Sequence, residues 1–356
     1  MKFKMIKILE LFGGIGACSK ALERLGIEYE IADYVEIDKY AVKSFNAMHD
    51  TNFEPQDICK WDKDIEVDLI MHGSPCQDFS LAGKQAGGDE GSGTRSSLMY
   101  ETIRIVEKLK PKYVIWENVK NLLSKKHRHN FDAYLETMEQ LGYTNYYQVL
   151  NAKDYGIPQN RERVFTISIR KDINKVFTFP QKQELKLKLK DMLEDEVDEK
   201  YYLTSSMINY LENGKYQSSK VSNKLKQTET GICPTLDTMQ GGNRQPFIKS
   251  KCKRLESLVE KTDFEEGKVL NMDLYNQTTN ENISQCLTEP HHNTQRLFDG
   301  LRIRKLTPRE CWRLMGFTDE EFEKAEKVNS NTQLYKQAGN SICVPVLMAI
   351  FKELIK

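Results

Sequence analysis

Hydrophobic and polar positions alternate in blocks along the first 170 residues. Short apolar runs typical of buried strands occupy residues 6–12, 29–35, 67–73, 112–119 and 163–169. Between them, apolar residues recur at helical spacing in 17–26, 97–109 and 131–142. Alternation of this kind predicts an α/β fold, with a mostly parallel, Rossmann-like sheet and helices on both faces.

The pattern changes after about residue 170. Residues 171–300 are polar and glycine-containing, with short β-like pieces, whereas helical patterns return at 306–317 and in the C-terminal tail. Thr307, Pro308 and Glu310 form a helix-start motif, and Gly316 is expected to end that helix. The tail is apolar enough to pack on the first domain. We therefore predict one domain from 1–175 and 330–356, and a smaller, loop-rich domain from 176–329.

Composition limits the class of protein. A chain of 356 residues with 29% charged residues suits two globular domains, and no apolar stretch approaches membrane-spanning length. The N-terminus lacks a signal-like region, so a cytoplasmic location is expected. Eight cysteines occur without a CxxC pair, and the paired histidines at 127/129 and 291/292 lack ligand-spaced partners. We expect no metal, and we expect these histidines to be solvated loop residues.

Charge is balanced overall but not locally. Residues 200–254 carry ten lysines and arginines against three acidic residues, although the net charge of the whole chain is zero. Such asymmetry favours a basic surface that meets nucleic acid, with an ordinary solvated surface as the alternative.

The first strand runs into the glycine turn "GGIG" at a predicted helix start. Glycines there let a ligand approach the backbone, and Glu36 lies twenty residues beyond Gly16, where a carboxylate can accept ribose hydroxyls. The turn predicts a nucleoside cofactor. The spacing is not GxGxxG, which weakens a dinucleotide interpretation but does not by itself separate NAD from S-adenosylmethionine.

Chemically reactive residues gather at predicted strand ends. Cys76, in "GSPCQDFS", follows one strand, and Glu117 ends another. Arg161 and Arg163 lie two residues apart at a third strand's start, so both can face one side. A thiol nucleophile, a buried carboxylic acid and two guanidiniums at one sheet edge suit attack on a polarised, electron-poor ring.

These motifs resemble those of the cytosine-C5 DNA methyltransferases. The sequence contains "ELFGGIG", "EID", "GSPCQDFS", "WENV", "QNRERV", "RKLTPRECWRLMGF" and "AGNS" in the family's order, over about 1–170 and 301–356. The resemblance implies the methyltransferase fold, S-adenosylmethionine as the cofactor, S-adenosylhomocysteine as its product and no metal. It implies a cofactor site made of Phe12, Gly14, Ile15, Gly16, Glu36, Ile37, Asp57, Ile58, Pro75, Leu98, Asn340 and Ser341.

The resemblance also implies a mechanism. Cys76 would attack C6 of a cytosine flipped out of the duplex, while Glu117 protonates N3, so that C5 takes the methyl group. Arg161 and Arg163 would complete the catalytic set. The base that removes the C5 proton is not identified. By the same resemblance, the glycine-rich stretch 81–97 would close over the flipped base.

We predict that the second domain reads the DNA sequence. Polar residues of the types that contact base edges cluster around a glycine pair in "TLDTMQGGNRQPF", and a lysine that can hold a phosphate follows. The expected DNA-binding residues are Gln240, Gly241, Gly242, Asn243, Arg244, Gln245 and Lys251. An exposed hairpin with incidental polar residues is the alternative for this stretch.

We expect a DNA (cytosine-5-)-methyltransferase, a monomer acting on double-stranded DNA, with a cognate restriction endonuclease as a candidate partner. Its setting would be restriction–modification or phage protection. Three alternatives stay open: an RNA (tRNA) methyltransferase of the same fold, a nicotinamide oxidoreductase, and a catalytically silent DNA-binding protein.

Overall fold

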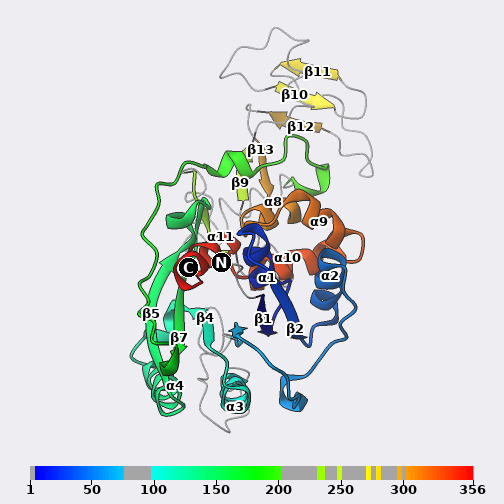
Figure 1. Ribbon diagram of the computed structural model, residues 1–356. Helices are drawn as coiled ribbons and strands as arrows, with labels where there is room; N and C mark the ends of the chain where they lie inside the picture. The colour runs from blue at the N-terminus through cyan, green and yellow to red at the C-terminus, as the bar shows by residue number, and fades with distance from the viewer. Residues whose placement is uncertain are drawn as a thin grey trace.

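The computed structural model describes residues 5–75, 98–202, 231–236, 247–250, 270–273, 278–281, 295–298 and 302–355. Its centre is a six-stranded sheet in the order β2-β1-β3-β4-β7-β5 (Figure 1). The strands are β1 Ile6–Leu11, β2 Tyr29–Val35, β3 Leu69–His72, β4 Tyr113–Val119, β5 Tyr143–Asn151 and β7 Glu162–Arg170.

The sheet is mostly parallel, as predicted. β1 pairs in parallel with β2 and β3, and β3 pairs in parallel with β4. β7 is the antiparallel member, because it pairs antiparallel with both β4 and β5. The carboxyl ends of β1 to β4 therefore meet the amino end of β7 at one edge of the sheet, which is the edge where ligands bind in open α/β sheets.

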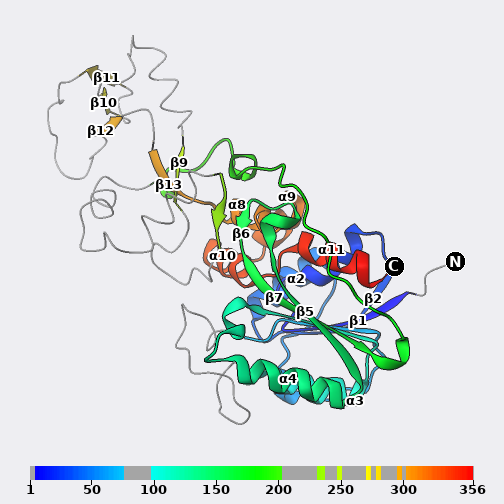
Figure 2. The ribbon, with the colours of Figure 1, turned by 90° about the vertical axis from the view of Figure 1, so that its left-hand side faces the viewer.

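Helices cover both faces of the sheet, which confirms the predicted α/β class (Figure 2). In β1, Ile8 packs with the helices of one face and its neighbour Leu9 with those of the other, so apolar residues on both sides of the strand are buried. α1 and α11 cover the first face, and α3 and α4 cover the second. The helices are α1 Ala17–Arg24, α2 Lys39–His49, α3 Met99–Leu109, α4 Arg128–Gln140, α8 Pro308–Arg313, α9 Asp319–Glu326, α10 Asn331–Asn340 and α11 Val344–Leu354. Short 3₁₀ helices are η1 Ile58–Lys60, η3 Lys120–Leu123, η4 Ala152–Tyr155, η5 Lys171–Ile173, η6 Leu189–Met192 and η7 Glu199–Tyr201.

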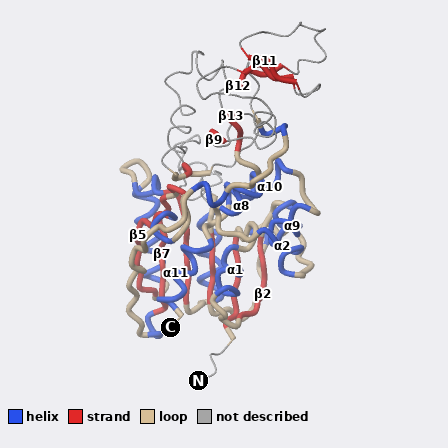
Figure 3. The backbone as a smooth tube through the Cα atoms, turned by 90° about the horizontal axis from the view of Figure 1, so that it is seen from above, coloured by secondary structure: helices blue, strands red, loops and turns tan. Residues whose placement is uncertain are grey.

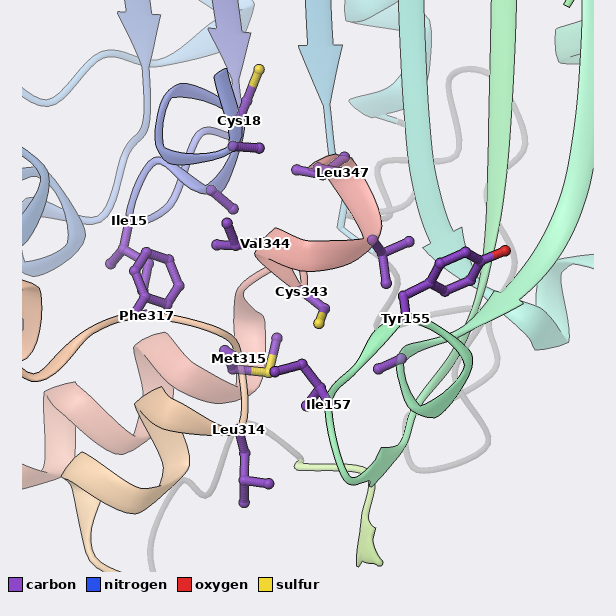
Figure 4. Close-up of a cluster of buried hydrophobic side chains, with 14 of the residues drawn as sticks. Ile15, Cys18, Tyr155, Ile157, Leu314, Met315, Phe317, Cys343, Val344 and Leu347 are labelled. Atoms are coloured by element: carbon purple, nitrogen blue, oxygen red, sulfur yellow. The ribbon is translucent and has the colours of Figure 1, made fainter. Parts of the chain in front are cut away.

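The C-terminal part of the chain returns to the first domain, as the apolar tail predicts. Val344 and Leu347 of α11 pack in one core with Cys18 of α1 (Figure 4). Trp312 and Phe317 belong to the same core, although they precede the predicted boundary at residue 329. The same core also contains Leu189 and Met192, so α8 and α9 pack among residues of both predicted domains, and the boundary stays a prediction.

α8 begins as the sequence predicts. The Thr307 hydroxyl accepts a hydrogen bond from Glu310 N at 3.2 Å, and the Glu310 carboxylate accepts one from Thr307 N at 2.8 Å. The same carboxylate forms a buried ion pair with Arg304 of β13, which contributes bonds of 2.7 and 2.8 Å. A fully buried, bidentate pair joins the start of α8 to the strand before it, and losing either partner would leave a charge uncompensated.

Short strands follow the main sheet in the sequence. They are β6 Gln159–Asn160, β8 Cys233–Pro234, β9 Phe247–Ser250, β10 Leu270–Asp273, β11 Thr278–Glu281, β12 Gln295–Phe298 and β13 Arg302–Lys305. Figure 3 shows β11, β12 and β13 beyond α8 and α10, on the side away from the chain termini. Within the described ranges, no helix is both long and apolar enough to cross a membrane.

Candidate active site

The glycine turn after β1 is built by close backbone contacts. A Cβ on Gly13 would lie 2.6 Å from the ring of Tyr34, and Gly16 begins α1 with a left-handed φ of 77°. The Tyr34 hydroxyl donates to Gly14 O at 2.6 Å, and Gly14 N donates to the Glu36 carboxylate at 3.1 Å. Among the described residues, a Cβ on Gly14 would meet only one backbone oxygen, at 4.0 Å, so the space around Gly14 is open on that side. The turn is therefore a rigid backbone cradle with an open side.

The end of β2 lies directly beside this cradle. The second oxygen of Glu36 accepts a hydrogen bond from Asp38 N at 2.8 Å, and burial raises the pKa of the Glu36 carboxyl. Next to it, the side chain of Ile37 is 70% exposed. Asp38 in turn forms a 2.6 Å ion pair with Lys336 of α10. A fixed carboxylate, a free apolar side chain and an open glycine backbone suit the ribose and base of a nucleoside, so the geometry fits the expected cofactor.

A buried carboxylate holds the neighbouring loop that carries Asp57. Asp33 accepts hydrogen bonds from the Trp61 indole nitrogen at 2.7 Å and the Gln56 amide at 3.0 Å, and Lys63 pairs with it at 2.7 Å. Burial opposes ionisation of Asp33, but these three donors outweigh it and lower its pKa. The sequence did not single out Asp33, because its partners lie more than twenty residues away.

Replacing Asp33 by alanine is expected to weaken cofactor binding about tenfold, roughly 1.4 kcal/mol. The buried indole and amide donors would lose their acceptor, and the loop that presents Asp57 would no longer be fixed. Calorimetric titration with S-adenosylmethionine measures the effect, and methylation at saturating cofactor should stay near the parent rate. Lys60→Met is the matched control, because Lys60 is an exposed lysine of the same segment and is not among the bonding partners of Asp33. Equal affinities for parent and Asp33→Ala would contradict the assignment.

Two side-chain hydrogen bonds connect the segment after β3 to the carboxyl end of β4. The Trp116 indole nitrogen donates to the Ser74 hydroxyl at 3.0 Å, and the Asn118 amide donates to Ser74 O at 3.3 Å. Both bonds are buried. They fix the backbone immediately before Pro75 and Cys76. Asn118 belongs to the motif "WENV", whereas the Ser74–Trp116 contact was not predicted, because a single polar contact leaves no periodic pattern in the sequence.

Glu117 lies at the same edge, beside Arg163. Its Oε1 is 3.0 Å from the Arg163 Nε, and both side chains are largely buried. Burial raises the pKa of the Glu117 carboxyl, although Arg163 and Arg161 oppose that shift. A Cβ placed on Gly73 would lie 3.8 Å from Glu117 Oε2, so this carboxyl faces the segment that leads to Cys76. Glu117 can thus hold a proton at higher pH than an exposed glutamate would.

Arg161 is used differently from Arg163. Its guanidinium donates to Leu236 O at 3.0 Å, to Gly339 O at 2.9 Å and to Ser341 O at 2.8 Å. From their spacing, the two arginines were expected to face one side, where paired guanidiniums suit a phosphate or a carbonyl oxygen. In the structure, Arg161 ties the α10–α11 junction and a piece of the loop-rich part to the sheet edge, beside Glu117.

The remaining predicted residues divide by location. Phe12, Ile15, Asp57, Ile58, Pro75, Leu98 and Ser341 are buried or half-buried around the same edge, and Asn340 is exposed. Cys76, residues 240–245 and Lys251 lie outside the described residues, as do the 81–97 stretch and His291 and His292.

The expectation that the histidines at 127 and 129 are solvated loop residues needs one correction. His127 is buried rather than solvated, because it begins α4 against the core, whereas His129 is exposed. In the part of the chain that the structure describes, no group of three His, Cys, Asp or Glu residues could hold a metal ion.

Comparison with known proteins gives a consistent result. The family model described as C-5 cytosine-specific DNA methylase matches residues 6–356. The chain is 35% identical to a type II methyltransferase, M2.ScrFI, of Lactococcus lactis subsp. cremoris, over 99% of both chains. It is 34% identical to the orphan methyltransferase M.SPBetaI of Bacillus phage SPbeta, covering 98% of this chain and 97% of that one.

Solved structures agree at the level of the fold. A DNMT2 mutant of Spodoptera frugiperda superposes with a TM-score of 0.67 at 20% identity, covering 99% of this chain and 100% of the other. A DNA modification methyltransferase from an E. coli prophage, described as putative, has a TM-score of 0.59 at 20% identity, with 98% of each chain covered.

Proposed function

Because the chain belongs to the C-5 cytosine-specific DNA methylase family, whose members methylate C5 of cytosine, we propose that the residues at this sheet edge perform that reaction on a flipped-out cytosine. The protein is a DNA cytosine-C5 methyltransferase. The observation that carries the assignment of residues is the buried Glu117–Arg163 pair facing the Ser74–Pro75 segment.

We assign the cradle beside β1 and β2 to S-adenosylmethionine. Gly14 and Gly16, which have no Cβ, would let the cofactor come close to the backbone. Glu36 would bind its ribose hydroxyls, and Ile37 would pack against its adenine. Asp57, held in place through the Asp33 loop, would meet the edge of the adenine ring. Phe12, Ile15, Ile58, Pro75, Leu98, Asn340 and Ser341 would complete the pocket. When bound, this cofactor supplies an electrophilic methyl group.

The protein side chains would supply the rest of the chemistry. The Cys76 thiolate forms a bond to C6 of the cytosine, and the Glu117 carboxyl donates a proton to N3, so that electron density collects at C5. Arg163 orients the Glu117 carboxyl through the 3.0 Å ion pair. After methylation, loss of the C5 proton lets the Cys76–C6 bond break. Ser74, Trp116 and Asn118 hold the segment that carries Cys76, and Arg161 holds the junction that closes the site.

The loop-rich part of the chain is our candidate for sequence recognition in double-stranded DNA. Its charge excess over residues 200–254 supports contact with phosphates, including one from Lys251. Gln240, Asn243, Arg244 and Gln245, around Gly241 and Gly242, would read base edges. An RNA substrate is disfavoured, since the curated relatives are named as type II or phage methyltransferases of the DNA methylase family.

Arg244→Ala is expected to cost roughly 1–3 kcal/mol on the cognate site and to relax discrimination at one base pair. The reason is that an arginine can bind a guanine edge through two hydrogen bonds. Lys251→Ala is the matched control, which should weaken all DNA sites alike. Methylation profiling on a randomised-site library separates the two. An Arg244→Ala profile that is only scaled in rate, with the parent's preferences at every position, would disprove the assignment.

The function itself is tested by bisulfite sequencing of DNA from cells that express the protein. We expect complete C5 methylation within one short sequence context and none elsewhere. Parallel assays with purified enzyme on DNA and on tRNA test the substrate class, and transfer to tRNA alone would overturn the DNA assignment. We place the enzyme in the cytoplasm with the DNA that it modifies, as a monomer in a restriction–modification or phage-protection setting.

A further inference from the structure

A basic turn lies just beyond the active-site strand β4. Residues 120–132, which run from η3 into α4, carry four lysines and arginines against one aspartate. The chain passes from Glu117 through η3 to this turn without leaving the carboxyl edge of the sheet. In Figure 2 the start of α4 lies at the same side of the sheet as β9 and β13. The turn therefore lies on the side where the DNA must enter.

The carboxylates near this turn already form ion pairs with other basic residues. Asp132 pairs with Arg128 at 2.7 Å, and Glu162 pairs with Lys120 at 3.0 Å. Lys125 and Lys126 are exposed, and neither ammonium group has an ion-pair partner within the described residues. Two neighbouring ammonium groups without carboxylate partners can neutralise phosphates of a DNA backbone and release the counterions bound there.

The turn is also held firmly in place. Arg128 N and His127 N both donate to Ser124 O, at 2.8 and 3.0 Å, and the His127 side chain is buried. Leu122 before the turn and Phe131 after it are fully buried. The two lysines thus project from a fixed base, so the binding of DNA would not have to order the backbone beneath them.

We propose that Lys125 and Lys126 form a phosphate-binding surface on the catalytic domain, which grips the DNA backbone close to the target cytosine. This inference rests on the proposed function. It differs from recognition by the loop-rich part in that these contacts read no sequence. Their role is to hold the duplex against the sheet edge while the base is flipped out.

The test is the salt dependence of DNA binding by the double variant Lys125→Gln/Lys126→Gln. Each phosphate contact contributes about 0.9 to the slope of log affinity against log salt, so the slope should become less negative by about 2. Between about 50 and 200 mM salt, the parent should then lose roughly tenfold more affinity than the variant. The KM for S-adenosylmethionine, the maximal rate at saturating DNA and the base preferences should stay those of the parent.

Lys110→Gln/Lys352→Gln is the matched control. These lysines are also exposed and unpaired among the described residues, but they lie at the start of β4 and near the end of α11, at the opposite edge of the sheet. The control should keep the parent's slope. A parent-like slope in Lys125→Gln/Lys126→Gln overturns the phosphate surface, while intact methylation in that variant shows that the enzymatic function stands. A parent enzyme that does not methylate DNA would instead refute the function.

Discussion

Cys76→Ala is expected to abolish methyl transfer while leaving DNA binding largely intact. The thiol forms the covalent bond to C6 that makes C5 nucleophilic, but it contributes little to the binding of the unreacted duplex. Single-turnover methylation and a gel-shift titration measure the two properties separately.

A covalent trap makes this test sharper. In a duplex with fluorine at C5 of the target cytosine, there is no C5 proton to lose, so the thiol cannot leave after methylation. The parent enzyme should then stay attached to the DNA on a denaturing gel. Cys59→Ala, at an exposed cysteine, is the matched control and should be trapped like the parent. Substantial turnover by Cys76→Ala would remove it as the nucleophile.

Glu117→Gln is expected to slow methyl transfer by about 10²–10⁴, the usual loss for a general acid. The amide keeps the size of the side chain but has no proton to donate to N3. Glu162→Gln is the control, because Glu162 is a neighbouring acid in an exposed ion pair. Affinity for S-adenosylmethionine should change little in either variant. A Glu117→Gln rate within a few-fold of the parent would exclude the proposed role.

The pH dependence gives an independent check on Glu117. Because burial raises its pKa, the carboxyl stays protonated to higher pH than an ordinary glutamate. An acid must be protonated before it acts, so the parent's kcat/KM should fall as the pH rises through this pKa. That decrease should be absent in Glu117→Gln. A profile in which both enzymes show the same alkaline decrease would assign the titration to another group.

The sequence predicts those parts of the fold that rest on local pattern. Most of β3 and the first half of β4 form continuous apolar runs, since both of their faces are covered. β5 lacks such a run and was missed, because it is an edge strand paired only with β7 and has several exposed residues. A domain boundary, such as the one predicted at residue 329, is harder to place from the sequence. The apolar spacing of α8 and α9 shows that they are buried, but not against which domain.

The sequence predicts where the candidate site residues lie along the strands, but not which contacts they make. Glu117 and Arg163 do meet at the sheet edge, as their positions at strand ends suggest. Arg161 has the same residue type and nearly the same position, yet it binds carbonyl oxygens about 180 residues away. Asp33 and Ser74 act through single contacts across the fold. Such contacts depend on where distant segments meet, which no local spacing encodes.

The packing of α11 against α1 has a consequence for folding during synthesis on the ribosome. α1 is made early, but α11, which completes its core, is synthesised roughly 300 residues later. At about 5–20 residues per second, roughly 300 intervening residues take about 15–60 s, during which the first half-core has exposed apolar surface. We therefore expect the protein to depend on chaperones and to fold slowly, because the contacts between α1 and α11 join residues far apart in the sequence. Nascent chains that terminate early should be degraded rather than accumulate as incomplete proteins.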